Sequence, residues 1–156
     1  MNPERTIYVD GGYNNFTKPD AYASVVNGYG VDILNSVPEL VNDMKIKEVL
    51  LPIGRRHIAI ANFNDVSIQQ NNGAELIAAV IGLRLAIYFN SIGINVENVC
   101  SDSQLIADYW SNKISKTATD INKIKYIKEL IKLKKEFTGR LVKIPGDKNP
   151  ADLGFH

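Results

Sequence analysis

The sequence predicts an α/β domain built from five strands and three main helices. Two observations predict this class. Three short segments rich in β-branched and aromatic residues come first, and helix-like and strand-like segments follow in alternation after them. The length of 156 residues and the 45% hydrophobic content suit one core, because two domains would each have too small a core.

The first three strands are expected at Thr6 to Asp10, Ala21 to Val26 and His57 to Phe63. The first two should form a hairpin, because Gly11-Gly12-Tyr13-Asn14-Asn15 between them has strong turn chemistry. Gly28 to Arg56 carries Gly, Pro and charged residues that interrupt short apolar runs, and we assign it no element.

The first helix is expected from Gly73 to Phe89, where no proline occurs and Asn72 stands in the capping position. A buried strand then follows at Asn98 to Ser101. The remaining elements are a helix from Ser103 to about Asn112, a helix from a cap at Asp120 to Phe137, a strand at Leu141 to Ile144, and a short helix start at Asn149-Pro150-Ala151-Asp152.

The bulk charge favours no class of partner. The chain has 18 basic and 17 acidic residues, which gives a formal net charge of +1. The longest apolar stretch, Leu76 to Phe89, contains Arg84 and is shorter than a bilayer span, so we expect no membrane segment.

The single cysteine, Cys100, lies in an apolar run and is expected to be a buried thiol. It cannot form an intramolecular disulfide, and the first residues show no basic and apolar leader, so we expect a cytoplasmic protein. His57, His156 and Cys100 are too few for a structural zinc site with nitrogen and sulfur ligands. Any metal must therefore be bound by oxygen.

Four acidic residues stand at the ends of predicted elements. Asp10 ends the first strand beside two glycines, and Glu75 lies in the first turn of the first helix. Asp102 follows a buried strand, and Asp152 lies in the first turn after Pro150. Each has a simpler explanation as a turn residue, a helix cap or a partner of the helix dipole.

The face of the first helix that carries Glu75 is the more informative feature. Small residues follow Glu75 at helical spacing, namely Ala78, Ala79, Gly82 and Ala86. Such a stripe lets a helix lie close to a sheet, which would bring Glu75 toward Asp10. Carboxylates gathered in this way repel one another unless a cation is bound, and the cation that suits oxygen ligands is Mg²⁺ or Mn²⁺.

Four motifs in this order resemble those of the type 1 ribonuclease H family, over nearly the whole chain except about Gly28 to Arg56. They are Asp10-Gly11-Gly12, Asn71-Asn72-Gly73-Ala74-Glu75, Ser101-Asp102-Ser103-Gln104 and Asn149-Pro150-Ala151-Asp152.

The resemblance implies a ribonuclease H-like fold, with a mixed five-stranded sheet of three antiparallel strands followed by parallel strands, flanked by helices. It implies an endonuclease that hydrolyses the RNA strand of RNA/DNA hybrids and leaves 5′-phosphate and 3′-hydroxyl ends. Two Mg²⁺ ions, or Mn²⁺, would be held by Asp10, Glu75, Asp102 and Asp152. The residues expected to contact the hybrid are Gly11, Gly12, Asn14, Asn15, Asn71, Asn72 and Gln104.

Two departures from the family pattern stand near the end of the chain. Many members have a mobile histidine before the last carboxylate, and here that stretch reads Pro145-Gly146-Asp147-Lys148. We therefore expect slow turnover, or a partial substitution by Lys148. The tail also resembles ribonuclease H domains of retrotransposon polyproteins and leaves no room for a terminal helix.

Positive charge is concentrated between Lys113 and Lys135, which includes eight lysines. Lys125, Lys128 and Lys132 recur at helical spacing and are the expected phosphate-binding surface. The alternative is a solvated helix face.

Two other functions fit the same sequence. One is a nuclease of this fold that acts on DNA, as resolvases and transposases do, and the other is a noncatalytic nucleic-acid-binding module. The Asn pair and Gln104 favour the hybrid over DNA, and retention of four carboxylates favours an enzyme. We expect a monomer.

Overall fold

The fold is described from a computed structural model of the chain. The structure describes residues 5–13, 21–27, 45–50, 56–61, 70–111 and 121–151. Only the backbone is described at 12–13, 21–27, 45–50, 56–61, 70–74, 77 and 121–125.

The centre of the fold is a mixed sheet of six strands in the order β3-β4-β2-β1-β5-β6. The pairs β1–β2, β2–β4 and β3–β4 are antiparallel, whereas β1–β5 and β5–β6 are parallel. The expected antiparallel-then-parallel sheet is thus confirmed. The strands are β1 (Thr6–Tyr13), β2 (Ala21–Asn27), β3 (Lys45–Leu50), β4 (Arg56–Ala61), β5 (Asn98–Ser101) and β6 (Arg140–Lys143).

The prediction of five strands was wrong by one. The additional strand is β3, which lies in the segment to which the sequence assigned no element, and it pairs with β4 at the edge of the sheet. Its sequence KIKEVL contains three charged residues. Edge strands tolerate such charges because one side of the strand has no neighbour, so the interrupted hydrophobic pattern did not exclude a strand.

The helices are α2 (Gln70–Ser91), α3 (Gln104–Trp110) and α4 (Ile121–Glu136), and a short 3₁₀ helix, η4, spans Gly146–Lys148. The start predicted for the first helix was three residues late. Asn72 therefore lies inside α2 and does not cap it. At the predicted helix start, Asn149 follows η4 and Pro150 and Ala151 form a turn, while the residues from Asp152 onward lie outside the described part of the chain, so the helix start stays a prediction.

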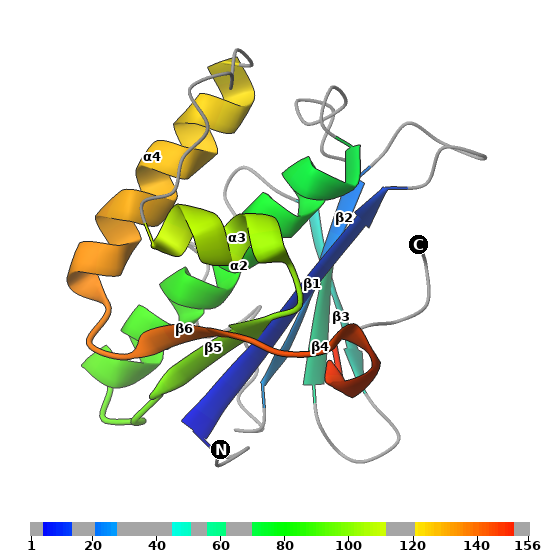
Figure 1. Ribbon diagram of the computed structural model, residues 1–156. Coiled ribbons are helices and arrows are strands. Elements are labelled where there is room, and N and C mark those ends of the chain that lie inside the picture. The colour runs from blue at the N-terminus through cyan, green and yellow to red at the C-terminus, as the bar shows by residue number, and fades with distance from the viewer. Residues whose placement is uncertain are drawn as a thin grey trace.

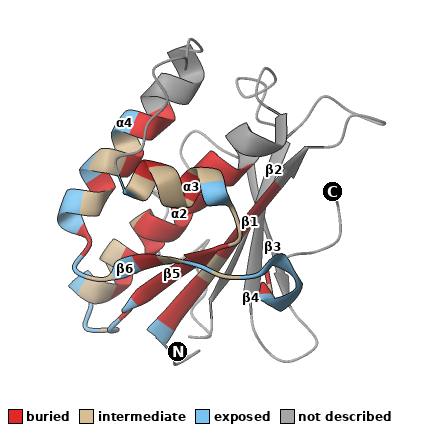
Figure 2. Ribbon diagram, viewed as in Figure 1, coloured by how far each residue is buried: buried red, intermediate tan, exposed pale blue. Residues whose placement is uncertain are grey.

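The helices form a layer against the sheet, with α2 in contact with β1 and β2, and α4 packed on α2 (Figure 1). The middle of α2 is buried almost completely between β1 and α4 (Figure 2). The buried side of α4 carries Tyr126, Ile127, Leu130 and Leu133. Among the described helices, none is apolar over a length that would cross a bilayer.

The stripe of small residues on α2 allows the helix to pack closely against the sheet, as the sequence predicted. Ala78, Ala79 and Ala86 are fully buried. A Cβ atom added to Gly82 would lie 2.4 Å from Val9 Cγ1 and 3.3 Å from Val99 Cγ1. The helix is therefore closer to β1 and β5 than any larger side chain at position 82 would permit.

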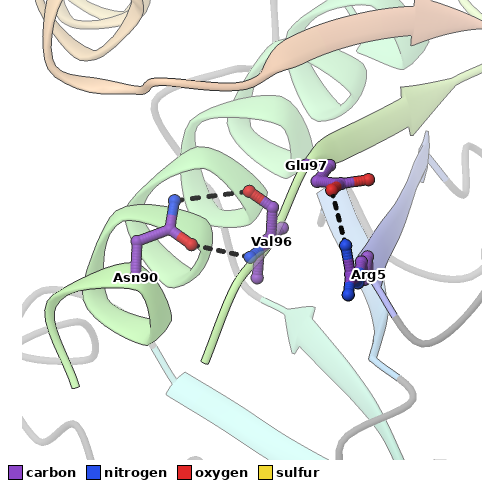
Figure 3. A network of polar contacts seen from close by, with 4 residues as sticks. All are labelled: Arg5, Asn90, Val96 and Glu97. Carbon is purple, nitrogen blue, oxygen red and sulfur yellow. Dashed lines mark hydrogen bonds and ion pairs between the residues drawn. The ribbon is translucent and has the colours of Figure 1, made fainter. Parts of the chain in front are cut away.

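A polar network fixes the start of β5 relative to α2 and β1 (Figure 3). Asn90 Nδ2 donates to the Val96 carbonyl at 3.3 Å, and the Val96 N–H donates to Asn90 Oδ1 at 2.6 Å. Next to it, Arg5 and Glu97 form an ion pair at 2.9 Å. The Asn90 contacts hold the residues before β5 against the end of α2, whereas the Arg5–Glu97 pair is exposed and contributes little.

Among the described side chains, two polar contacts join the helices to one another. Arg84 in α2 donates to Glu129 in α4, with Nε and Oε1 2.8 Å apart. Lys134 in α4 donates to the Trp110 carbonyl, and its Nζ lies 5.4 Å from the centre of the Trp110 ring. Cys100 is buried as predicted, and burial raises the pKa of its thiol to about 11.

We predict that Gly82→Ala destabilises the fold by about 1–3 kcal/mol, because the added methyl overpacks against Val9. Helix propensity alone would make the same substitution stabilise the fold by about 1 kcal/mol. The sign of the change in the free energy of unfolding therefore tells the two effects apart. Urea denaturation measures the free energy of unfolding.

The control is the same substitution in a Val9→Ala background, which removes the atom that the new methyl would meet. There the cost of Gly82→Ala should fall by at least about 1 kcal/mol. Equal costs in the two backgrounds would contradict the close packing.

Candidate metal centre

Three of the four predicted carboxylates converge. Asp10, Glu75 and Asp102 each offer one oxygen, and these three oxygens lie within 4.8 Å of one another. The residues come from β1, α2 and the turn after β5, so the cluster is made by the tertiary fold. It is the only group of three or more potential metal ligands among the described residues.

Asp10 lies inside β1 rather than at the end of the strand, where the sequence had placed it. The strand continues to Tyr13, and Asp10 pairs with Ser24 of β2. Gly11 and Gly12 extend the strand and do not form the predicted turn, because β2 pairs with both of them. Asp10 is fully buried, which excludes the simpler explanation of an exposed turn residue.

Glu75 was expected in the first turn of its helix, but the earlier start of α2 puts it in the second turn. A favourable interaction with the helix dipole therefore does not explain this residue, since that effect is confined to the first turn. Glu75 is only 9% exposed, and its carboxylate accepts a hydrogen bond from the Gly11 backbone.

Asp102 directly follows β5 and lies before α3, as predicted. The alternative was that Asp102 caps the helix. The cap is instead Ser103, whose Oγ accepts from the Ile106 N–H at 3.3 Å. The turn is further held by Ser103 N–H, which donates to Ser101 Oγ at 3.1 Å. The carboxylate of Asp102 is therefore not used to start α3.

The electrostatics of the cluster are unfavourable without a cation. The pKa of Glu75 is raised from 4.5 to about 10, first by burial, then by a side-chain hydrogen bond with Asp10 and by the charges of Asp10 and Asp102. The hydrogen bond from Gly11 opposes this rise only in part. Without a cation, burial and the neighbouring carboxylates therefore favour the protonated form of Glu75.

The residues present fit a hard divalent cation. All three donors are carboxylate oxygens, which Mg²⁺ and Mn²⁺ prefer. Glu75 Oε2 is buried and accepts no hydrogen bond from the described part of the chain, so a ligand is needed to satisfy it in its charged form. A cation would do so and would offset the repulsion between the three acids.

The other predicted site residues stand as follows. Asp152, Asn14 and Asn15 lie outside the described residues. Gly12, Asn71, Asn72 and Lys125 lie in β1, α2 and α4, and only their backbone is described.

Gly11 is buried next to the cluster, since its backbone N–H donates to Glu75. Gln104 is exposed at the start of α3, and its Nε2 donates to Asp108 Oδ1 at 2.9 Å. Lys128 and Lys132 are exposed on α4. Lys148 is exposed in η4. This short helix lies near the cluster, because a Cβ atom added to its first residue, Gly146, would be 3.5 Å from Asp102 Oδ2.

One residue near the cluster was missed by the sequence analysis. Asn149 was expected only to cap a short helix, but it is buried and its Nδ2 lies 3.3 Å from Asp102 Oδ2. The sequence signal was the Asn-Pro pair itself, which marks a turn but says nothing of a contact 47 positions away.

A separate surface hollow lies at the opposite end of β5 and β6. Its charged residues are already engaged, because Glu97 pairs with Arg5 and Arg140 Nε donates to Asn98 Oδ1 at 3.2 Å. The hollow contains none of the three clustered carboxylates, so we assign it no part in the site. It is lined by Asn95, Val96, Glu97, Asn98, Thr138, Gly139 and Arg140.

Comparison by sequence finds no relative of this chain. No protein-family model matches it, and no curated protein matches it.

Comparison by structure finds many similar chains. Ribonuclease H1 of Halobacterium salinarum NRC-1 is 15% identical with a TM-score of 0.57, over 94% of this chain and 89% of that one. The N-terminal ribonuclease H domain of a Mycobacterium tuberculosis protein is 16% identical with a TM-score of 0.51, over 92% and 85%. The compost metagenome protein LC11-RNase H1, in complex with an RNA/DNA hybrid, is 19% identical with a TM-score of 0.56, over 93% and 88%. The chain therefore has the fold of the type 1 ribonucleases H.

Proposed function

We propose that this chain is a metal-dependent endonuclease that hydrolyses the RNA strand of RNA/DNA hybrids. The observation that carries the proposal is the convergence of Asp10, Glu75 and Asp102 within 4.8 Å. Each of the three lacks the simpler structural role that its sequence position suggested. A largely buried cluster of acids that turns, caps and the helix dipole do not explain is typical of a functional site.

The ions would be Mg²⁺ or Mn²⁺, bound by these three residues with Asp152 as a fourth ligand. Bound divalent cations supply activation of the attacking water and neutralisation of charge at the scissile phosphate. Asp10, Glu75 and Asp102 would bind and orient the cations, and the burial of Asp10 and Glu75 keeps bulk water from one side of the centre. The expected products are a 5′-phosphate and a 3′-hydroxyl.

The hybrid is the proposed substrate for two reasons. A protein of the same fold, LC11-RNase H1, has been solved in complex with an RNA/DNA hybrid. Amide side chains at Asn71, Asn72 and Gln104, at the start of α2 and α3, are of the type that reads 2′-hydroxyl groups and base edges in a wide minor groove.

The test is incubation with labelled RNA/DNA hybrid, duplex RNA, duplex DNA and a branched DNA junction, each with Mg²⁺, Mn²⁺ or chelator. We expect the RNA strand of the hybrid alone to be cut, and only with metal. Cleavage of the junction or of duplex DNA would favour a resolvase-like enzyme. Absence of cleavage on all four would favour a binding module.

The matched variants are Asp10→Asn and Glu97→Gln. Asp10→Asn should lower kcat by more than roughly 100-fold, because loss of a ligand should cost more than the 10- to 100-fold typical of outer-shell partners. Glu97 is an exposed acid at the opposite end of β5, so Glu97→Gln should change kcat less than about twofold. Equal effects of the two variants would exclude the proposed centre.

A second prediction concerns stability against pH in chelator. Folded Glu75 holds a proton that the unfolded chain releases above pH 4.5, so the free energy of unfolding should fall as the pH rises from 4.5 toward 10. The contribution is at most about 1.4 kcal/mol per pH unit. Guanidinium denaturation at pH 5 to 8 measures it.

Two comparisons isolate this contribution from other titrating groups. Glu75→Gln removes the proton-binding group, so its stability should fall less steeply with pH than that of the wild type. Mg²⁺ at saturating concentration should flatten the wild-type curve, because the cation replaces the proton. Parallel curves for wild type and Glu75→Gln in chelator would be inconsistent with a raised pKa.

A third prediction concerns the lysines of α4. Lys128, Lys132 and Lys135 are exposed on the side of α4 that faces away from the core. If they contact phosphates, replacing all three by Gln should reduce the slope of log Kd against log salt by about 2 to 3. Hybrid binding is measured with the Asp10→Asn protein.

The control is replacement of the same three lysines by Arg, which keeps the charge and should keep the slope. An unchanged slope in the Gln variant would place the phosphate contacts elsewhere.

A further inference from the structure

Asn149 joins three separate segments through one buried amide. Its Nδ2 donates to the Val9 carbonyl at 2.9 Å and to Asp102 Oδ2 at 3.3 Å. Its Oδ1 accepts from the Ala151 N–H at 3.1 Å. The residue is only 5% exposed, so these hydrogen bonds replace contacts with water.

The three partners have one property in common. Val9 precedes Asp10, Asp102 is itself in the cluster, and Ala151 precedes Asp152. The Asn149 amide therefore forms hydrogen bonds with Asp102 itself and with the residues directly before Asp10 and before Asp152, the proposed fourth ligand.

The position of Asn149 follows from the lengths of the strands. The ladder between β1 and β5 ends at the pair of Tyr8 and Cys100, although β1 continues to Tyr13. Beyond that point the Asn149 side chain, rather than a strand backbone, donates to Val9. β6 ends at Lys143 and η4 then turns the chain back, which brings Asn149 to this place.

The chemistry requires an amide in one orientation. The Val9 carbonyl and a charged Asp102 only accept hydrogen bonds, so both need the NH₂ group of Asn149. The Ala151 N–H only donates, so it needs the amide oxygen. A carboxylate at position 149 would keep the bond to Ala151 but lose both donations and would repel Asp102.

We propose that Asn149 is a positioning residue that fixes Asp102 and the turn leading to Asp152 relative to Asp10, so that the cluster is preorganised for a divalent cation. This inference rests on the proposed function, since it assumes that the cluster binds metal. Side chains that orient metal ligands typically contribute 10- to 100-fold to metal affinity or activity.

The experiment compares wild type, Asn149→Ala and Asn149→Asp in two assays. The first is a Mn²⁺ titration followed by the rise in Tm, without substrate. The second is cleavage of an RNA/DNA hybrid with kcat and KM determined separately. Both variants should raise the Mn²⁺ midpoint about 10-fold or more and lower kcat, while KM for the hybrid changes less than about twofold.

The matched control is Asn98→Ala. Asn98 is also buried, at 4% exposure, and also makes a side-chain hydrogen bond between neighbouring strands, but it lies at the opposite end of β5. This variant should lower Tm in chelator and leave the Mn²⁺ midpoint unchanged. The midpoint therefore separates a positioning role from a merely structural one.

Each outcome decides a different claim. If wild type gives no Mn²⁺-dependent rise in Tm and no cleavage, the proposed function fails, and this inference fails with it. If wild type responds and the two Asn149 variants share its midpoint and kcat, only the inference fails. Should Asn149→Ala not fold, Asn149→Asp decides, because it keeps the size and the bond to Ala151. If neither folds, Asn149 holds the fold rather than the site, and the inference is wrong.

Discussion

The close approach of α2 to β1 is the constraint on which the site depends. Gly82 lies against Val9 with no room for a Cβ atom, and Glu75 stands two turns earlier on the same face of α2. The helix therefore runs along β1 at short range, and Glu75 reaches the backbone of Gly11 beside Asp10. A larger residue at position 82 would move the helix outward and separate the two carboxyl groups.

This packing also explains how the fold tolerates the cluster. Five large apolar residues of α2, namely Leu76, Ile81, Leu83, Leu85 and Phe89, are at most 1% exposed. Burial of such side chains contributes about 1.5–3 kcal/mol each, so together they stabilise the helix on the sheet by roughly 10 kcal/mol. This burial opposes the unfavourable electrostatics that the three acids bring to the metal-free cluster.

The sequence predicted the parts of the site that follow from local pattern, and missed those that follow from long-range contacts. The spacing of Ala78, Gly82 and Ala86 was sufficient to predict the close helix. Gly11 was read as a turn, although pairing with β2 keeps it in the strand, because no local pattern reports a partner strand. Asn72 resembled a cap, but the helix starts two residues earlier, at Gln70. The bond from Asn149 to Val9 spans 140 positions and leaves no trace in local spacing.

In the proposed enzyme, the charges that would attract the nucleic acid lie apart from the acids that would bind the metal. The net charge is only +1, yet three acids are concentrated at one place and the exposed side of α4 carries Lys128, Lys132 and Lys135. A phosphate that approaches the bare acids is repelled, so the acids alone cannot recruit a nucleic acid. In the proposed enzyme, cations at the cluster would reverse the sign of the local field, whereas the lysines would attract a phosphate backbone with or without metal. Substrate affinity should thus depend on salt through α4, and substrate alignment at the cluster should depend on metal.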